Sequence, residues 1–386
     1  MVTPARKSLS SFQIGLGWFP EEAYGVNRVY YNLVRHLPQV GVQVCGLVTG
    51  SSRVEQDSGQ QVRAYAPPTA PLLVRWRALR RESRKVLAEQ RPDLVASHVA
   101  LYTFPLLDLT RSYPLVIHFH GPWALEGQVE VGRRLVANAK ATLERVVYRR
   151  GACCIVLSHA FGKILHQHYG VPRERIRRIP GGVEVRRFAT DLTRREAKER
   201  LGWPQDRPVV FTLRRLARRM GLEDLVSAMK EVRRWVPEVL LLIAGKGALA
   251  AELAAQVESQ GLQNNVRLLG FLPDEDLPLA YRGADLSILP TVALEGFGLP
   301  AAESLAAGTP VLVTPVGGLP EVVSDLSSEL VLPGTGAGPI AEALGAALSG
   351  AMTLPDAAAC RDYARTRYDW TVVAAQIREV YSEAYK

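Results

Sequence analysis

Short apolar runs alternate along the chain with longer segments in which apolar residues recur every three or four positions. Runs of the first kind are typical of buried strands, and segments of the second kind are typical of helices packed on a sheet. In the first half, strands are predicted at residues 12–17, 42–50, 94–100, 114–121 and 151–158, and helices at 28–37, 71–90 and 132–150. This alternation indicates a parallel sheet covered by helices on both faces.

The same alternation restarts after residues 179–188, a segment with a Pro-Gly-Gly turn that suits a linker. Further strands are predicted at 208–216, 239–245, 266–272, 285–290, 311–315 and 329–332. We therefore expect an α/β protein with two Rossmann-like, doubly wound domains, residues 1–185 and 186–369, that face each other across a cleft. The acidic run at 274–276 is interpreted as the cap of the helix that follows it, in preference to a metal site.

Composition agrees with a two-domain globular protein, because the chain has 386 residues, of which 47% are hydrophobic and 22% charged. The charge, however, is uneven. Residues 1–185 hold 25 of the 47 Lys and Arg but 13 of the 38 Asp and Glu, a balance of +12, against −3 for the rest. This asymmetry suggests an anionic partner for the first half.

The expected cellular location follows from the absence of targeting signals. The N-terminal residues have no apolar core of signal-peptide length, and no stretch approaches the ~20 apolar residues of a membrane-spanning helix. The four cysteines have no metal-ligand spacing. We therefore expect a cytoplasmic protein with reduced thiols and no metal site.

Candidate chemistry is concentrated in residues 285–318. A predicted strand is followed by a loop with two glycines, 295–298, and then by a helix with Pro300 in its first turn. The start of such a helix attracts phosphate through its unpaired N–H groups and the positive end of its dipole. Glu295 precedes this anion site, and Glu303 lies about one turn inside the helix.

The two carboxylates follow the order of parts in a nucleotide-sugar, which runs from sugar through diphosphate to ribose. With the diphosphate at the helix start, one carboxylate would accept hydrogen bonds from sugar hydroxyls and the other from ribose hydroxyls. The spacing of the two glutamates would by itself favour a solvated surface helix. The Gly-Phe-Gly-Leu-Pro sequence after Glu295, between two apolar strands, favours the binding site instead.

The sequence EGFGLPAAE at 295–303, followed by AAGTPVLVTPVGGLPEVV, strongly resembles retaining glycosyltransferase family 4. The resemblance covers nearly the whole chain and implies the two-Rossmann GT-B fold, with a C-terminal helix at 370–386 that crosses back onto the first domain. It implies a hexosyltransferase that uses a nucleotide-diphosphate sugar, expected to be a UDP-sugar, and needs no metal or other cofactor. In this family pattern Glu295 orients the hexose and Glu303 the ribose.

Two further positions match the family motifs and one departs from them. Arg215 stands in an Arg-Leu pair and is expected to neutralise the diphosphate, while His120 stands in a His-Gly pair and is expected to contact the donor sugar. Met220 replaces the usual Lys, so Arg218 or Arg219 is left to supply a second positive charge. The predicted catalytic residues are His120, Glu295 and Arg215. The predicted donor-binding residues are Gly25, Arg215, Arg219, Gly245, Leu272, Glu295, Gly296, Phe297, Gly298, Leu299 and Glu303.

The first domain departs from the family pattern at two glycines. Gly25 stands alone where the family has a Gly-Gly pair, and Gly181 stands where Asn is common. Strand alternation places His118 and His120 on one face and Phe119 on the other. These departures affect the site assignments more than the fold.

The basic excess of the first half is densest in one predicted helix, where six Lys and Arg fall between positions 75 and 85. An apolar stripe is predicted along the same helix at Leu72, Trp76, Leu79, Ser83 and Val86. Three interpretations are left open: a scaffold helix with a solvated basic face, a surface for anionic lipid, and a pocket for a phosphorylated acceptor. The acceptor is accordingly expected to be a sugar, a sugar phosphate or a lipid-linked molecule, with peripheral contact to the inner face of a membrane through residues 72–87.

Two functions of other classes remain open from the sequence. A nucleotide-sugar epimerase shares the two-domain fold, and a non-catalytic polyanion-binding protein would account for the basic half. The polyanion-binding function gives no reason for the Glu295–Glu303 pair. No nucleic-acid partner is expected.

Overall fold

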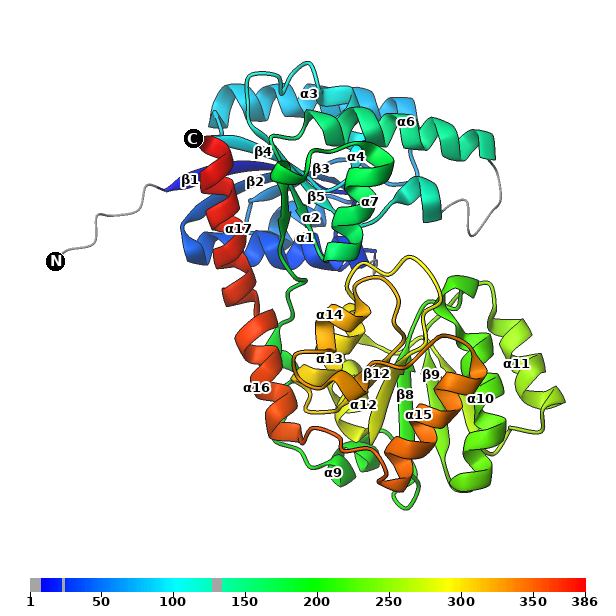
Figure 1. Cartoon of the computed structure of the whole chain (residues 1–386). Coiled ribbons are helices and arrows are strands. Elements are labelled where there is room, and N and C mark those ends of the chain that lie inside the picture. The colour runs from blue at the N-terminus through cyan, green and yellow to red at the C-terminus, as the bar shows by residue number, and fades with distance from the viewer. Residues whose placement is uncertain (1–7, 23–24, 127–133) are drawn as a thin grey trace. The chain divides into compact units, whose positions relative to one another are not determined.

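The computed structural model describes residues 8–22, 25–126 and 134–386, which form two compact units (Figure 1). The first unit comprises Met1–Gly182 and Trp370–Lys386, and the second comprises Val183–Asp369. Each unit is built on one parallel sheet, which confirms the predicted α/β class with two doubly wound sheets. The break between the units follows Gly182, whereas the sequence places it after residue 185.

The first unit has a seven-stranded sheet in the order β3-β2-β1-β4-β5-β6-β7. Its strands are β1 (Leu9–Ile14), β2 (Val42–Thr49), β3 (Val62–Ala66), β4 (Leu94–Ser97), β5 (Leu115–Phe119), β6 (Cys153–Val156) and β7 (Ile176–Arg178). The two edge strands, β3 and β7, were not predicted. Both are short and expose part of their side chains, so neither has the continuous apolar run of a buried strand.

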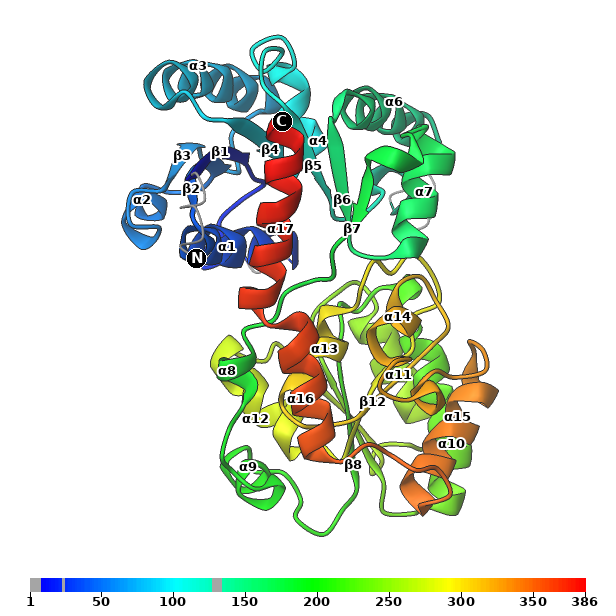
Figure 2. The ribbon, with the colours of Figure 1, turned by 60° about the vertical axis from the view of Figure 1, so that its left-hand side comes forward.

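Helices cover both faces of this sheet. Figures 1 and 2 show α3 (Leu72–Gln90) and α6 (Arg134–Arg150) on one side, and α1 (Gly25–His36) with α17 (Trp370–Tyr385) on the other. Shorter helices complete the unit: α2 (Arg53–Asp57), α4 (Ala100–Thr103) and α7 (His159–Tyr169). The C-terminal helix α17 packs on α1 and reaches β4 and β5. Residues 23 and 24, and residues 132 and 133 of the predicted helix at 132–150, lie outside the described residues.

The second unit has a five-stranded sheet in the order β10-β9-β8-β11-β12. Its strands are β8 (Val209–Leu213), β9 (Leu240–Ala244), β10 (Val266–Gly270), β11 (Leu286–Leu289) and β12 (Val311–Val313). Figure 1 shows α10 (Leu222–Trp235), α11 (Ala250–Ser259) and α15 (Ala337–Ser349) on one side of this sheet. On the other side lie α9 (Arg194–Arg200), α12 (Leu277–Gly283), α13 (Leu299–Ala306) and α16 (Ala357–Tyr368). Two shorter helices are α8 (Val185–Phe188) and α14 (Leu319–Val323).

Two local predictions for the second unit are wrong. The strand expected at 329–332 is reduced to a single bridge between Val331 and Val313, since Pro333 has no N–H with which to extend a ladder. The acidic run does not cap α12 through a side chain. Asp276 already has helical backbone angles, whereas a capping residue needs an extended conformation. Asp274 pairs instead with Arg187, at 2.7 Å.

Both sheets reverse their strand order beside the first strand of the unit. The reversal lies between β1 and β4 in the first unit and between β8 and β11 in the second. At such a point the connections leave the sheet in opposite directions, so the carboxyl ends of the two strands open onto a crevice that can hold a ligand. Arg215 and Arg219 follow β8 and Glu295 follows β11, whereas His120 follows β5, the strand next to β4.

A buried carboxylate anchors the loop after β5. Glu144 of α6 is fully buried and accepts hydrogen bonds from the backbone N–H groups of Trp123 and Ala124, at 3.0 and 3.2 Å. It also accepts from the hydroxyls of Tyr148 and Tyr169, at 3.0 and 2.9 Å. Burial raises the pKa of Glu144. Because four donors depend on one side chain, Glu144 fixes the chain immediately beyond His120 and Gly121.

We expect Glu144→Ala to destabilise the protein by about 3 kcal/mol or more, because each buried donor left without an acceptor costs roughly 1–3 kcal/mol. Denaturant unfolding of the full chain measures this change. The matched control is Glu89→Ala at the exposed end of α3, which should change stability by less than about 0.5 kcal/mol. Equal stability of the two variants would contradict the anchoring role of Glu144.

Candidate functional site

The loop between β11 and α13 is held rigidly against the rest of the second unit. Phe297 is 3% exposed, and its ring packs edge-on against Tyr368 with the centroids 5.3 Å apart. Gly298 has φ +88° and precedes the first residue of α13, where an added Cβ would collide with Leu319. The Gly-Phe-Gly sequence therefore combines a buried anchor with a left-handed turn that begins the helix.

The segment just before that turn carries backbone strain. Leu294 has φ +53°, which is uncommon for a residue with a branched side chain. Its carbonyl accepts a hydrogen bond from Arg219 Nη1 at 3.0 Å. The carbonyl of Glu295 accepts from the N–H of Gly318 at 2.9 Å, and Gly317 packs so closely on Glu295 that a Cβ would not fit. Strain held by such contacts is typical of functional sites.

A buried ion pair joins the ends of β8 and β11. Arg214 directly follows β8, and its Nη2 donates to Thr291 Oγ1 and to Glu295 Oε2. The side chains of Arg214 and Glu295 are 5% and 15% exposed. Arg214 was not among the predicted residues, although a basic residue directly after a buried strand and a carboxylate after the neighbouring strand were both visible in the sequence.

The three arginines that follow differ in their surroundings. Arg215 is exposed. Arg218 is 67% exposed and pairs with Glu223 at 3.3 Å and with Glu252 at 3.1 Å, on α10 and α11. Arg219 is half-buried and contacts the loop that carries Glu295. Of the two candidates for the second positive charge, Arg219 is therefore the one that lies beside this loop.

The remaining predicted residues of the second unit lie at the same edge of the sheet. Glu303 is 5% exposed and accepts a hydrogen bond from the hydroxyl of Tyr281 at 3.1 Å. Gly245 follows β9 with φ +133° and packs on the backbone of Arg214, where a Cβ would collide. Leu272 follows β10 and is half-buried. The carboxyl edge thus brings together residues that the sequence separates by about ninety positions.

The first unit brings three histidine rings together with nearly parallel planes. His98 follows β4, and His118 and His120 come from the end of β5. The ring centroid of His98 lies 4.3 Å from that of His118 and 5.2 Å from that of His120, with interplanar angles of 14° and 16°. The predicted alternation is confirmed, because Phe119 points to the opposite face and packs against Phe161. His98 was not predicted, although it follows an apolar run just as His120 does.

Burial keeps these histidines neutral near pH 7. It lowers the pKa of His120 from 6.5 to about 4. Burial and the neighbouring histidines lower the pKa of His98 and His118 well below 6.5. Gly25, the other predicted residue of this unit, is the exposed first residue of α1, where an added Cβ would meet no atom within 4 Å.

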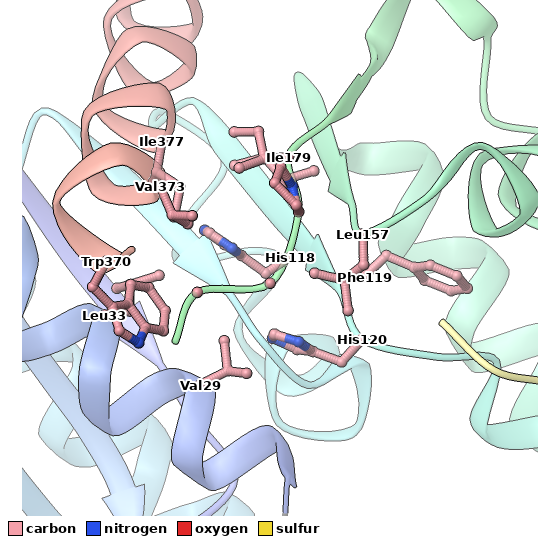
Figure 3. Close-up of a pocket in the computed structure, with 14 residues that line it drawn as sticks. Val29, Leu33, His118, Phe119, His120, Leu157, Ile179, Trp370, Val373 and Ile377 are labelled. Carbon is pink, nitrogen blue, oxygen red and sulfur yellow. The ribbon is translucent and has the colours of Figure 1, made fainter. Parts of the chain in front are cut away.

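A small, mostly apolar cavity lies beside two of the histidines (Figure 3). His118 and His120 line it together with Trp370, Val373 and Ile377 of α17. Its volume of about 20 Å³ is enough for one water molecule but not for a sugar. Within the described ranges, no group of three His, Cys, Asp or Glu is arranged to hold a metal ion. Within the same ranges, no helix has both the length and the apolar character needed to cross a membrane.

Two sequence families match the chain in succession. Residues 23–187 match Glycosyltransferase Family 4, and residues 193–367 match Glycosyl transferases group 1. The two matches correspond closely to the two sheets of the structure.

Individual relatives match over parts of the chain. Mannosylfructose-phosphate synthase of Agrobacterium fabrum is 34% identical over 47% of this chain and 41% of its own length. A GDP-mannose-dependent alpha-(1-6)-phosphatidylinositol monomannoside mannosyltransferase of Mycolicibacterium smegmatis is 31% identical over 66% of this chain and 68% of its own length. The chain thus spans less than half of the first relative and about two thirds of the second.

The fold is that of a solved glycosyltransferase. A sucrose-phosphate synthase of Thermosynechococcus elongatus superposes with a TM-score of 0.80 at 22% identity, covering 98% of this chain and 99% of that chain. This likeness confirms the predicted GT-B fold.

The buried ion pair leads to a prediction about stability. We expect Glu295→Ala to cost about 3–5 kcal/mol, because it leaves the buried Arg214 guanidinium without its counter-charge. The double variant Arg214→Met with Glu295→Leu should recover most of that loss, since a buried pair can often be replaced by apolar side chains. Denaturant unfolding of the two variants provides the measurement. If Glu295→Ala proves as stable as the unchanged protein, the pair does not hold this loop.

Proposed function

The chain belongs to glycosyltransferase family 4, and from this membership we propose that it is a retaining hexosyltransferase that uses a nucleoside-diphosphate sugar. The acceptor group is proposed to be a hydroxyl of a sugar, a sugar phosphate or a lipid-linked molecule. The observation that carries this proposal is the arrangement of Glu295 and Glu303 around the start of α13. Both carboxylates lie at the point where the strand order of the second sheet reverses.

The start of α13 is proposed to bind the diphosphate. The helix begins at Leu299, and the N–H groups and dipole of such a helix start favour an anion. The proposed partners are the amides of Gly298 and Leu299 with the guanidinium groups of Arg215 and Arg219. These groups would stabilise the charge that develops on the leaving diphosphate, so that the reaction needs no metal ion.

The two glutamates are proposed to hold the two ends of the donor. Glu303 would accept hydrogen bonds from the ribose hydroxyls, from a buried position where Tyr281 already orients it. Glu295 would accept from hydroxyls of the hexose, and Arg214 holds its carboxylate in one orientation. In the first unit, His120 is the residue proposed to contact the donor sugar. Gly245 and Leu272 are proposed to lie near the nucleoside.

UDP is the proposed nucleotide, with GDP as a second candidate because one relative is named as GDP-mannose-dependent. A thermal-shift panel of UDP-, GDP- and ADP-sugars separates these donors, since a ligand at ~100 times its Kd adds roughly 2.7 kcal/mol to stability. Transfer assays with sugar phosphates and lipid-linked sugars then test the reaction, with EDTA present throughout. Loss of transfer in EDTA that magnesium or manganese restores would contradict the proposed metal independence.

The same assays separate the other functional classes. An epimerase would change the donor sugar in the absence of any acceptor, and a polyanion-binding protein would show no stabilisation by any nucleotide-sugar. Either result would overturn the transferase proposal.

We expect the two glutamates to have separable roles. Glu303→Ala should weaken binding of the nucleoside diphosphate by about 1–3 kcal/mol, the usual value of hydrogen bonds to a charged group. Glu295→Gln, which keeps an acceptor for Arg214, should leave that binding nearly unchanged and lower kcat. Calorimetric titration and steady-state kinetics measure the two effects. If both variants lose only nucleotide affinity, Glu295 does not act on the sugar.

Helix α3 is proposed to bring the enzyme to an anionic membrane surface. Its predicted apolar stripe is confirmed, because Leu79, Ser83 and Val86 are buried.

Several basic side chains of α3 already have partners in the first unit: Arg80 pairs with Asp108, Arg81 and Lys85 pair with Glu82, and Arg75 donates to Tyr102. Arg77 and Arg84 are exposed, and so are two apolar side chains about one turn before Arg77, Leu73 at 64% and Val74 at 50%. Exposed apolar and basic side chains on one helix are typical of interfacial binding.

We expect Arg77→Gln with Arg84→Gln to weaken binding to vesicles that contain phosphatidylserine. Each basic residue near the surface contributes ~1 kcal/mol, so removal of two should lower the affinity for vesicles roughly thirtyfold at low salt. The decrease should be smaller at high salt, because salt screens the charges. The control is Lys230→Gln with Arg234→Gln, which removes the same charge from α10. Vesicle co-sedimentation provides the measurement. Equal binding by the two double variants would contradict the proposed membrane role of α3.

A further inference from the structure

A continuous hydrogen-bonded chain runs through the interior of the first unit beneath His120. His120 Nε2 lies 3.0 Å from His98 Nδ1, and His98 Nε2 lies 3.0 Å from Gln13 Oε1. Gln13 Nε2 in turn donates to Ser11 Oγ at 2.9 Å and to the hydroxyl of Tyr381 at 3.1 Å. Gln13 is fully buried in β1, and His98 is 5% exposed at the end of β4. The proposed function uses His120 but gives no role to the other residues of this hydrogen-bonded chain.

Ser11, at the far end of the hydrogen-bonded chain, determines which atoms in it donate and which accept. A serine hydroxyl has one hydrogen, and that of Ser11 is donated to the carbonyl of Gln43 at 3.2 Å. Ser11 Oγ can therefore only accept from Gln13, so the amide nitrogen of Gln13 faces Ser11 and its oxygen faces His98. The orientation of one buried amide is thus fixed by its neighbours.

The tautomers of the two histidines follow from that orientation. A neutral imidazole carries one N–H and has one acceptor nitrogen. Since Gln13 Oε1 can only accept, the hydrogen of His98 is on Nε2, and His98 Nδ1 is an acceptor. The hydrogen between the two rings therefore belongs to His120 Nε2. His120 Nδ1 is then left as an acceptor.

We propose that His98, oriented by Gln13, is a positioning residue that fixes His120 as the Nε2–H tautomer, so that His120 presents Nδ1 to a hydroxyl of the donor sugar. The contact with the sugar rests on the proposed function, whereas the tautomer rests on the hydrogen-bonded chain. The low pKa of both rings agrees with the neutral state that this assignment requires.

The C-terminal helix supports the arrangement from the side. Tyr381 of α17 is fully buried, and its hydroxyl lies 2.8 Å from His118 Nε2 while it accepts from Gln13. His118 stacks on His98, so the ring of His98 is held both by its hydrogen bonds and by a flat contact. His118, near the end of β5, lies next to Val373 and Ile377 of α17, and His120 follows just beyond the strand (Figure 3). Tyr381 and His118, which are far apart in the sequence, therefore help to hold the ring of His98 in place.

The tautomer is read directly by NMR. In the full chain labelled with ¹⁵N-histidine at pH 7, two-bond ¹H–¹⁵N correlation distinguishes protonated from bare ring nitrogens, and the signals of His120 are identified by their loss in His120→Phe. We expect a protonated Nε2 and a bare Nδ1 for His120. The opposite tautomer, or averaged shifts from a mixture of the two, would overturn the proposal.

Substitution of His98 tests its role. His98→Asn keeps an acceptor near the position of Nδ1 and should keep the tautomer of His120, whereas His98→Phe keeps the flat ring without the acceptor and should produce a mixture. The control is His166→Asn on α7, where the ring bonds to the carbonyl of Val171 and should not affect His120. If His98→Phe does not fold, Gln13→Met removes the acceptor for His98 and should also give a mixture. An unchanged tautomer in the folded variant would exclude the positioning role.

Kinetics separates this proposal from the proposed function. We expect His98→Phe to lower kcat about tenfold, the value of one ordinary hydrogen bond, with nucleotide affinity unchanged and with most activity restored in His98→Asn. A mixed tautomer with unchanged kcat would confirm the positioning of His120 and would contradict the contact between His120 and the sugar.

Discussion

The reversal of strand order in each parallel sheet is the constraint on which the rest of this structure depends. Where neighbouring strands send their connections to opposite faces, the side chains that follow them must fill or line the opening between them. In the second unit Arg214 after β8 meets Glu295 after β11 at this place. In the first unit the corresponding strands are β1 and β4, and they supply Gln13 and His98. Both units therefore place buried polar side chains where a Rossmann sheet offers a ligand site.

Burying these polar groups costs stability, and the cost indicates a role beyond folding. A buried ion pair is commonly no more stable than apolar side chains of similar size, so the Arg214–Glu295 pair is weak evidence for stability. The Nε of Arg214 is buried and has no hydrogen-bond partner among the described residues. A buried donor without a partner adds to the cost of burying the pair. What the pair achieves is a carboxylate held in one orientation at the start of α13, before any ligand arrives.

The sequence was sufficient for the broad architecture and for the loop around Glu295, because both depend on local patterns. Apolar runs mark the buried central strands, and Gly-Phe-Gly followed by Pro marks a helix that begins at a sharp turn. Edge strands such as β7 lack the apolar run, since they are partly exposed.

Contacts between distant segments could not be predicted in the same way. Neighbouring residues beyond a strand point in different directions, so Arg214 and Arg215 cannot be distinguished without coordinates. The sequence also could not show which of Arg218 and Arg219 lies beside the Glu295 loop, because Arg218 pairs with two glutamates of α10 and α11 instead. The link from His120 to Gln13 depended on the register between three parallel strands.

A crystal structure of the chain with its best-binding nucleoside diphosphate tests the central claim most directly, because it shows where the nucleotide binds. We expect a phosphate oxygen within about 3.2 Å of a backbone N–H at the start of α13, and the ribose hydroxyls hydrogen-bonded to the Glu303 carboxylate. A nucleotide bound away from the carboxyl edge of the second sheet, or bound there with its ribose turned away from Glu303, would contradict the account.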